Sequence, residues 1–291
     1  MLTWGVRLHR GVVKHAKPCI FCGIRPATSK EHFWPQWLAP HIPPAVPNSH
    51  VTEFHSGEGK QAQWLLRRSE RPGALNTKKI RAVCPQCNNG WMSELEGRAK
   101  TVMLDLFKGD ATGLTRESAI TLARWACVKA TVGEHATQET ALTPREDRLT
   151  LYEKQHLPKY TRVFLAYHAL TTQTAYVRHS TTVSRSFSGP QPSLPVGVSR
   201  NIQATTFLVG PLCFYVTSVR VSGLDAGVLD PPIPMIRLWP EPASDLDLAG
   251  TAPLSLEQGQ SPESHVGSAD CTSPSQVRRS IAAGARACDL T

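Results

Sequence analysis

The chain has 291 residues, of which 41% are apolar, and its mean hydropathy of −0.24 favours a globular protein with a sizeable core. No stretch approaches the roughly 18–20 unbroken apolar residues of a membrane helix, and the first residues lack the apolar centre of a signal peptide. We therefore expect a cytoplasmic protein without a membrane partner. The formal net charge is +9, and residues 1–100 hold 15 Lys and Arg against 6 Asp and Glu, a surplus of nine positive charges. This basic N-terminal third favours a polyanionic partner such as nucleic acid, although a solvated basic surface accounts for the charge equally well.

Two C-x-x-C pairs, Cys19 with Cys22 and Cys84 with Cys87, lie in the same third of the chain. The cytosol keeps thiols reduced, so paired cysteines of this spacing indicate a metal site and not disulfides. Each pair can present two thiolates from one tight turn, and two pairs together complete a four-thiolate zinc site with Zn–S distances of roughly 2.3 Å. Because 61 residues separate Cys22 from Cys84, the metal would close a long loop. Its saturated coordination makes the predicted zinc structural and not catalytic.

The segments between and after these pairs predict a loop, a strand and three helices. Residues 39–50 are rich in proline and predict a loop, whereas residues 78–84 predict a strand that enters the second pair. A helix is predicted from about residue 91 to Gly109, because its apolar residues recur at three- and four-residue steps and Ser93 and Glu96 have capping-box spacing. A second helix over residues 116–134 is apolar on nearly every side, so we expect it to be buried. A third helix begins at the TPRE stretch that starts at residue 143.

The composition changes near residue 160, where β-branched and aromatic segments alternate with Gly, Pro and Ser turns. An antiparallel sheet is predicted, with strands over residues 161–170, 174–183, 202–210, 212–221 and 233–240. Residues 243–291 have little apolar content and predict a disordered tail. We therefore expect an α+β protein with four parts. These are a zinc-containing domain over residues 1–110, a helical segment over 111–158, a β-rich domain over 159–242 and the tail over 243–291.

Three further residues near the cysteine pairs carry side chains suited to catalysis. Glu31 and His32 are adjacent, and on a strand they would point to opposite faces. Asn88 directly follows a predicted zinc ligand, which would fix its backbone. Carboxylate and amide oxygens are hard ligands suited to Mg²⁺ or Mn²⁺, and an imidazole can remove a proton from water. If they lie close together, these groups can hydrolyse a phosphodiester, whereas the alternative for His32 is a purely structural histidine.

The order C-x-x-C, Glu-His, C-x-x-C-N and then a helix, over residues 19–107, resembles the HNH nuclease family. It is similar in particular to the zinc-stapled branch of that family, typified by phage recombination endonuclease VII. The resemblance implies a ββα-metal unit inside a treble-clef-like zinc scaffold, with the four paired cysteines as structural zinc ligands. It also implies that His32 is the general base and that Glu31 and Asn88 hold a catalytic Mg²⁺ or Mn²⁺. The chain departs from the family pattern in having Glu31 where Asp is more usual, and in the long gap between the cysteine pairs.

These observations favour a metal-dependent DNA endonuclease of the HNH type. The basic residues expected to contact DNA are Lys30, Arg67, Arg68, Lys78, Lys79 and Arg81. The alternative is a non-catalytic, zinc-stapled nucleic-acid-binding protein with the same fold and charge. A more distant alternative is a regulatory protein that binds a protein partner through the β-rich half. Nothing in the sequence sets the oligomeric state.

Overall fold

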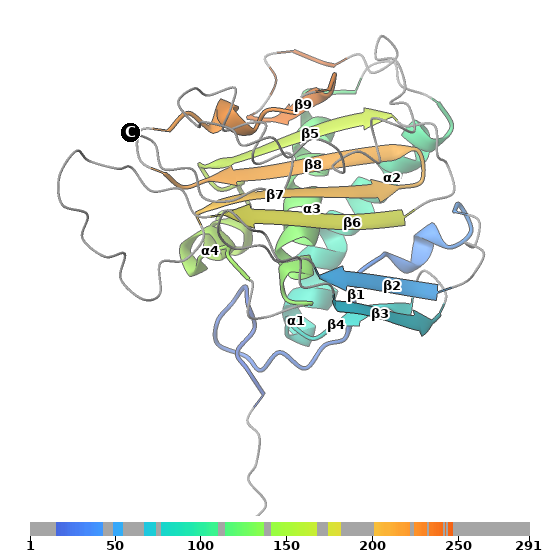
Figure 1. The fold of residues 1–291 in the computed structure, drawn as a ribbon, viewed down its shortest axis with the longest axis vertical. Helices are drawn as coiled ribbons and strands as arrows, with labels where there is room; N and C mark the ends of the chain where they lie inside the picture. Colours follow the sequence, from blue (N-terminus) through green and yellow to red (C-terminus); the bar gives the residue numbers. More distant parts are fainter. Residues whose placement is uncertain are drawn as a thin grey trace, which may run out of the picture.

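A five-stranded antiparallel sheet, with a layer of helices on one of its faces, makes up the larger part of the fold (Figure 1). The computed structural model describes residues 16–42, 49–54, 67–73, 77–109, 114–136, 141–167, 174–181, 201–221, 224–231, 233–240, 242 and 244–246. The mixture of helices and strands agrees with the predicted α+β class.

The sheet contains every strand predicted after residue 160. Its members are β5 (Thr161–Tyr167), β6 (Thr174–Thr181), β7 (Ile202–Val209), β8 (Leu212–Val219) and β9 (Ile236–Trp239). They are hydrogen-bonded in the order β6-β7-β8-β5-β9, and every neighbouring pair is antiparallel. The tight β7–β8 connection passes through Gly210, whose φ of +57° is a conformation that favours glycine. The prediction of an antiparallel sheet is therefore confirmed.

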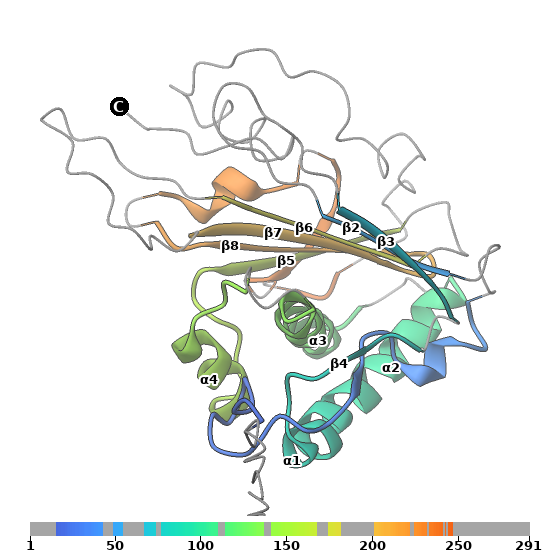
Figure 2. The same cartoon turned by 60° about the horizontal axis from the view of Figure 1, so that its bottom comes forward.

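The central helix α3 (Arg116–Glu134) lies between the sheet and α2 (Ser93–Phe107), with α4 (Arg145–Glu153) at its side (Figure 2). Its bounds are those predicted, and Thr115 caps its N-terminus by accepting a hydrogen bond from the Ser118 amide. Trp125 of α3 packs against Phe207 and Phe214 of the sheet, with ring centroids 5.9 and 5.5 Å away. Because α3 is covered on both sides, it has to be apolar nearly all round.

The helix after the second cysteine pair begins earlier than predicted. It starts as α1 (Pro85–Cys87) and continues through η3 (Asn88–Met92), a wide turn that is kinked at Gly90 (φ −95°, ψ −116°), before α2 begins. Cys84 is the N-cap residue, and its sulfur accepts a hydrogen bond from the Cys87 amide at 3.4 Å. The predicted capping box is therefore wrong, because Met92 before α2 is already helical and no side-chain hydrogen bond caps this helix. The predicted stop is confirmed, since Gly109 follows the helix with a φ of +83°.

Two small strand pairs and one short helix form the rest of the N-terminal part. They are β1 (Glu31–His32) with β4 (Lys79–Ile80), β2 (Ser49–Phe54) with β3 (Arg67–Pro72), and the 3-10 helix η1 (Gln36–Leu38). The strand predicted over 78–84 is only two residues long, because Ala82 and Val83 instead accept hydrogen bonds from Ile20 and Ser29 of the first cysteine turn. Of the loop predicted over 39–50, residues 43–48 lie outside the described residues and 49–50 belong to β2.

The start of the predicted tail is ordered. Leu246 exchanges two backbone hydrogen bonds with Leu114, at 3.0 and 2.9 Å, and Asp245 accepts one from the Arg116 amide. These contacts secure the beginning of α3, which explains why residues 244–246 depart from the predicted disorder. The remainder of that prediction lies outside the described residues. Within the described parts of the chain, no helix combines the length and the apolar character needed to cross a membrane.

Substitution of Gly133, in the last turn of α3, tests how tightly this helix packs on the sheet. A Cβ at this position would lie 2.7 Å from the Tyr176 hydroxyl, and that ring is in turn packed edge-on against Phe33 at 4.9 Å. We predict that Gly133→Ala destabilises the protein by about 1–3 kcal/mol through overpacking. Gly97→Ala on α2 is the matched control, because nothing lies within 4 Å of its Cβ, and it should stabilise the protein by up to about 1 kcal/mol. Urea denaturation measures both, and equal effects of the two substitutions would contradict the packing.

Candidate functional site

The two cysteine pairs meet in one buried cluster, as the sequence predicts. The first turn is closed by a hydrogen bond from the Gly23 amide to the Cys19 carbonyl at 2.9 Å, and Gly23 has a φ of +68° that favours glycine. The second turn is the beginning of α1, where Cys84 caps the helix. The sulfurs of Cys19, Cys22, Cys84 and Cys87 all lie within 4.8 Å of one another. Two distant segments of the chain are thus joined at a single point.

The geometry of this cluster fits zinc. The Cys22 and Cys84 sulfurs are 3.8 Å apart, close to the edge of roughly 3.8 Å of a tetrahedron with four Zn–S bonds of about 2.3 Å. A hydrogen bond with the Cys87 thiol lowers the pKa of Cys19 to about 4, against the opposing effect of burial. Cys19 is therefore favoured as a thiolate, the form that binds metal, whereas burial raises the pKa of Cys84 and the hydrogen bond with Cys19 raises that of Cys87. With four buried sulfur ligands, the ion has no open position for substrate.

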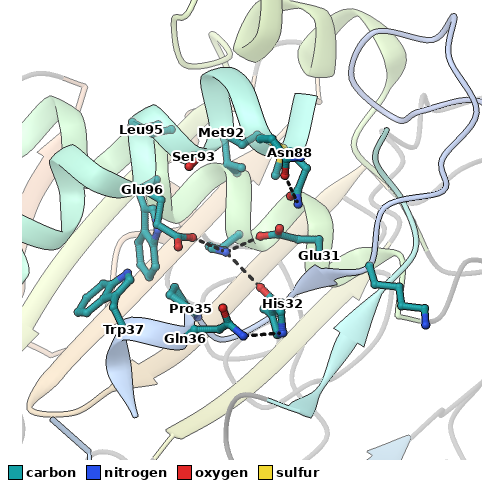
Figure 3. A pocket seen from close by; sticks show the side chains of 15 residues that line it. Glu31, His32, Pro35, Gln36, Trp37, Asn88, Met92, Ser93, Leu95 and Glu96 are labelled. Carbon is teal, nitrogen blue, oxygen red and sulfur yellow. Dashed lines mark hydrogen bonds and ion pairs between the residues drawn. The ribbon is translucent and has the colours of Figure 1, made fainter. Parts of the chain in front are cut away.

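An open pocket of about 500 Å³ lies where β1, η1, η3, α2 and α3 meet (Figure 3). Its lining includes Glu31, His32 and Asn88, the three residues predicted to act in catalysis. Lys30 also lines it, and its side chain is exposed. The structure thus brings the predicted catalytic residues to one cavity, although they come from parts of the chain more than 50 residues apart.

Glu31 is held by a buried lysine that the sequence analysis did not identify. Lys129 of α3 is 5% exposed, and its ammonium lies 2.7 Å from Glu31 Oε1, 3.0 Å from Glu96 Oε2 and 3.3 Å from the His32 carbonyl oxygen. Burial lowers the pKa of Lys129, but the attraction of Glu31 and Glu96 raises it by more, so the net pKa is raised and the lysine stays charged. Glu31 is therefore fixed in direction, with Oε1 engaged by the ammonium.

His32 points away from this ion pair, as expected for adjacent residues on a strand. Its ring lies beside Gln36, whose amide nitrogen is 3.3 Å from His32 Nε2 (Figure 3). With the Gln36 amide placed this way, its nitrogen donates to Nε2, which corresponds to the His32 tautomer with the proton on Nδ1. Burial and the nearby positive charge of Lys79 lower the pKa of His32, partly offset by Glu31. A neutral imidazole at the edge of an open pocket is able to accept a proton.

The side-chain oxygen of Asn88 has the chemistry of a metal ligand. Its Nδ2 donates to Asn89 Oδ1 at 3.5 Å, which links the two adjacent amides, but its own buried Oδ1 has no hydrogen-bond partner among the described residues. A buried acceptor left unpaired costs about 1–3 kcal/mol, so such an atom suits a position where a cation or water is bound. Asn88 begins η3, which is kinked at Gly90. The donor set of Glu31 and Asn88 fits Mg²⁺ or Mn²⁺.

The predicted DNA-contacting residues are only partly brought together. Lys79 lies directly opposite His32 in the β1–β4 pair and is exposed, as is Arg81. Lys78 is instead half-buried over the Phe33 ring, with its ammonium 5.5 Å from the centroid, and burial lowers its pKa. Arg67 and Arg68 belong to β3, and their side chains lie outside the described part of the structure.

Glu96 and Lys129 are the residues of the pocket that the sequence analysis missed. The spacing of Glu96 from Ser93 predicts a helix-capping role and not an ion pair with a lysine. Lys129 stands alone among apolar residues in the stretch WACVKATV, and a lysine inside a buried helix requires a charged partner. The position of Lys129 in an apolar helix indicates a buried ion pair, but it does not identify the acidic partner.

The chain matches no family model, no curated protein and no solved structure at a significant level. Its function is therefore inferred from the residues of the pocket and the cysteine cluster.

Removal of one ligand tests the zinc site. We predict about one zinc ion per chain in the purified protein, falling well below one half for Cys22→Ser after gel filtration with a chelator. Cys213→Ser is the control, because Cys213 is equally buried but lies in the sheet outside the cluster, and it should retain zinc. Elemental analysis gives the ratio. A zinc content that is the same in both variants would contradict the assignment.

Proposed function

We propose that this protein is a metal-dependent endonuclease that hydrolyses phosphodiester bonds in DNA. The observation that carries the proposal is the meeting of Glu31, His32 and Asn88 at one open pocket. The unpaired Asn88 oxygen, the neutral imidazole and the adjacent zinc-type cluster support it independently. A basic N-terminal third, with exposed Lys30, Lys79 and Arg81 near β1 and β4, suits a polyanionic substrate.

The local arrangement supports a resemblance to the HNH family. Two short antiparallel strands, β1 and β4, pair with each other and precede the helical segment that begins at Pro85, as in a ββα-metal unit, with η1, β2 and β3 inserted between them. In that scheme the acid and the histidine lie on the first strand and the asparagine at the start of the helix, which are the positions of Glu31, His32 and Asn88. The treble-clef-like scaffold would correspond to the two cysteine turns joined by zinc.

The proposed chemistry divides the work among these side chains. His32 would take a proton from the attacking water through Nε2, the atom that now accepts a hydrogen bond from Gln36. Glu31 and Asn88 would hold a Mg²⁺ or Mn²⁺ ion, which supplies stabilisation of the phosphate charge and of the departing 3′-oxygen. Lys30 and Lys79 would attract the DNA backbone toward the pocket.

One observation favours the non-catalytic alternative. Lys129 already neutralises Glu31, so the pocket carries an internal cation at a carboxylate that the proposal assigns to a metal. A zinc-stapled nucleic-acid-binding protein with no hydrolytic activity would use the same fold, cluster and basic surface. The two functions differ in whether DNA is cut.

Plasmid nicking tests the proposal. We predict that the purified protein nicks or cuts DNA in Mg²⁺ or Mn²⁺ and not in EDTA, and that His32→Ala lowers the rate by about 10²–10⁴-fold, as expected for loss of a general base. His156→Ala is the matched control, because His156 is an exposed histidine that does not line the pocket. Its rate should be unchanged.

Supercoiled, branched and single-stranded DNA are compared in the same assay, with zinc content and circular dichroism as checks of folding. Binding without cutting on all three substrates would replace the endonuclease with the non-catalytic alternative. Equal activity of the wild type and His32→Ala would remove His32 from the mechanism.

A further inference from the structure

Lys129 has the surroundings of a bound metal ion. Three oxygens face its ammonium within 3.3 Å, from Glu31 on β1, Glu96 on α2 and the His32 carbonyl. Carboxylate and carbonyl oxygens of this kind are the ligands that hard divalent cations take in proteins. The ammonium of Lys129 on α3 is therefore surrounded by oxygens of the kind that bind a metal ion.

The Glu31 carboxylate uses only one of its two oxygens to bind Lys129. Its Oε1 binds the ammonium, and among the described residues none forms a hydrogen bond or an ion pair with Oε2. In Figure 3, Asn88, with its unpaired Oδ1, lies on the Glu31 side of the pocket, and the His32 ring lies away at Gln36. In two-metal phosphodiesterases a carboxylate commonly bridges two cations roughly 3.5–4 Å apart. Here one of the two positions beside Glu31 is filled by the lysine.

We propose that Lys129 takes the place of a second metal ion, so that the pocket accepts one divalent cation where its oxygen ligands would otherwise hold two. This inference rests on the proposed function for the identity of the first ion, but not for the role of the lysine. Removing the ammonium leaves Glu31 and Glu96 facing each other without a counter-charge, and a divalent cation can then bind between them.

The formal charges explain why a single lysine has this effect. Glu31 and Glu96 together carry −2, and Lys129 reduces this to −1. A second divalent ion and the ammonium would repel each other at the same oxygens, so the ion would have to displace the ammonium. The lysine is also covalently attached and cannot be removed by a chelator, which leaves the pocket dependent on only one exchangeable ion.

Mn²⁺ binding to the zinc-loaded protein tests the inference, measured by electron paramagnetic resonance and calorimetry. We expect about one Mn²⁺ per chain in the wild type and about two in Lys129→Met, with the added ion lost again in the double variant Lys129→Met/Glu96→Gln. Lys108→Met is the matched control. Lys108 pairs with Asp105 at 3.2 Å on the exposed face of α2, so its loss should add no bound ion.

Lys129→Gln is included because it keeps a hydrogen-bond donor in the pocket and so tolerates the buried carboxylates better than methionine. If zinc-loaded Lys129→Met is unfolded before Mn²⁺ is added, Mn²⁺ should restore folding and raise its Tm more than that of the wild type. No additional Mn²⁺ in either variant overturns the inference. A failure of Mn²⁺ to restore folding where both variants unfold also overturns it, because the divalent ion would then not replace the ammonium.

The same titration separates this inference from the proposed function. No Mn²⁺ in the wild type but one in Lys129→Met would leave the role of the lysine standing and remove the catalytic metal from the wild-type pocket. One Mn²⁺ in both proteins would leave the catalytic metal standing and make Lys129 a purely structural ion-pair partner.

Discussion

The buried ammonium of Lys129 is the constraint on which the arrangement of the pocket depends. An unpaired charge inside a protein is costly, so a lysine on a helix covered on both sides has to find acceptors. It finds them on β1 and α2, and the resulting contacts join these two elements to α3. The direction of Glu31 is one consequence. Another is that His32, the next residue on the same strand, faces the other way, toward Gln36.

The four-cysteine cluster supplies the second fixed point. It joins turns that lie 61 residues apart in the sequence, and the chain passes from Cys87 directly into η3, which begins with Asn88. A zinc ion there would do no chemistry itself, but it would hold Asn88 at the edge of the pocket. The site thus combines two kinds of charge compensation, thiolates around a metal and carboxylates around a lysine. Among the described residues, the open pocket lined by Lys129, Glu31 and Asn88 is the place where we expect a substrate to bind.

The sequence predictions that succeeded rest mostly on patterns of residues close together in the chain. The C-x-x-C spacing, the apolar helix over 116–134 and the alternating strands after residue 160 are short-range patterns, and each predicted its structure. The capping box of Ser93 and Glu96 is also short-range, but it was overridden because Cys84 and Pro85 begin the helix earlier. The ion pair of Lys129 with Glu31 spans 98 residues, and no local pattern reveals it. The predicted catalytic residues converge, whereas the partner of Glu31 could be found only from the fold.

A crystal structure grown with Mn²⁺, with anomalous diffraction recorded at the zinc and manganese edges, tests the central claim most directly. The account predicts zinc among the four cysteine sulfurs and a single Mn²⁺ bound by Glu31 and Asn88, with Lys129 still paired to Glu31 and Glu96. The contrary result would be a pocket without Mn²⁺ in crystals whose cysteine cluster holds zinc, or two Mn²⁺ ions with the lysine displaced. The first would make the pocket a structural ion-pair network, and the second would show that Lys129 does not limit the site to one metal.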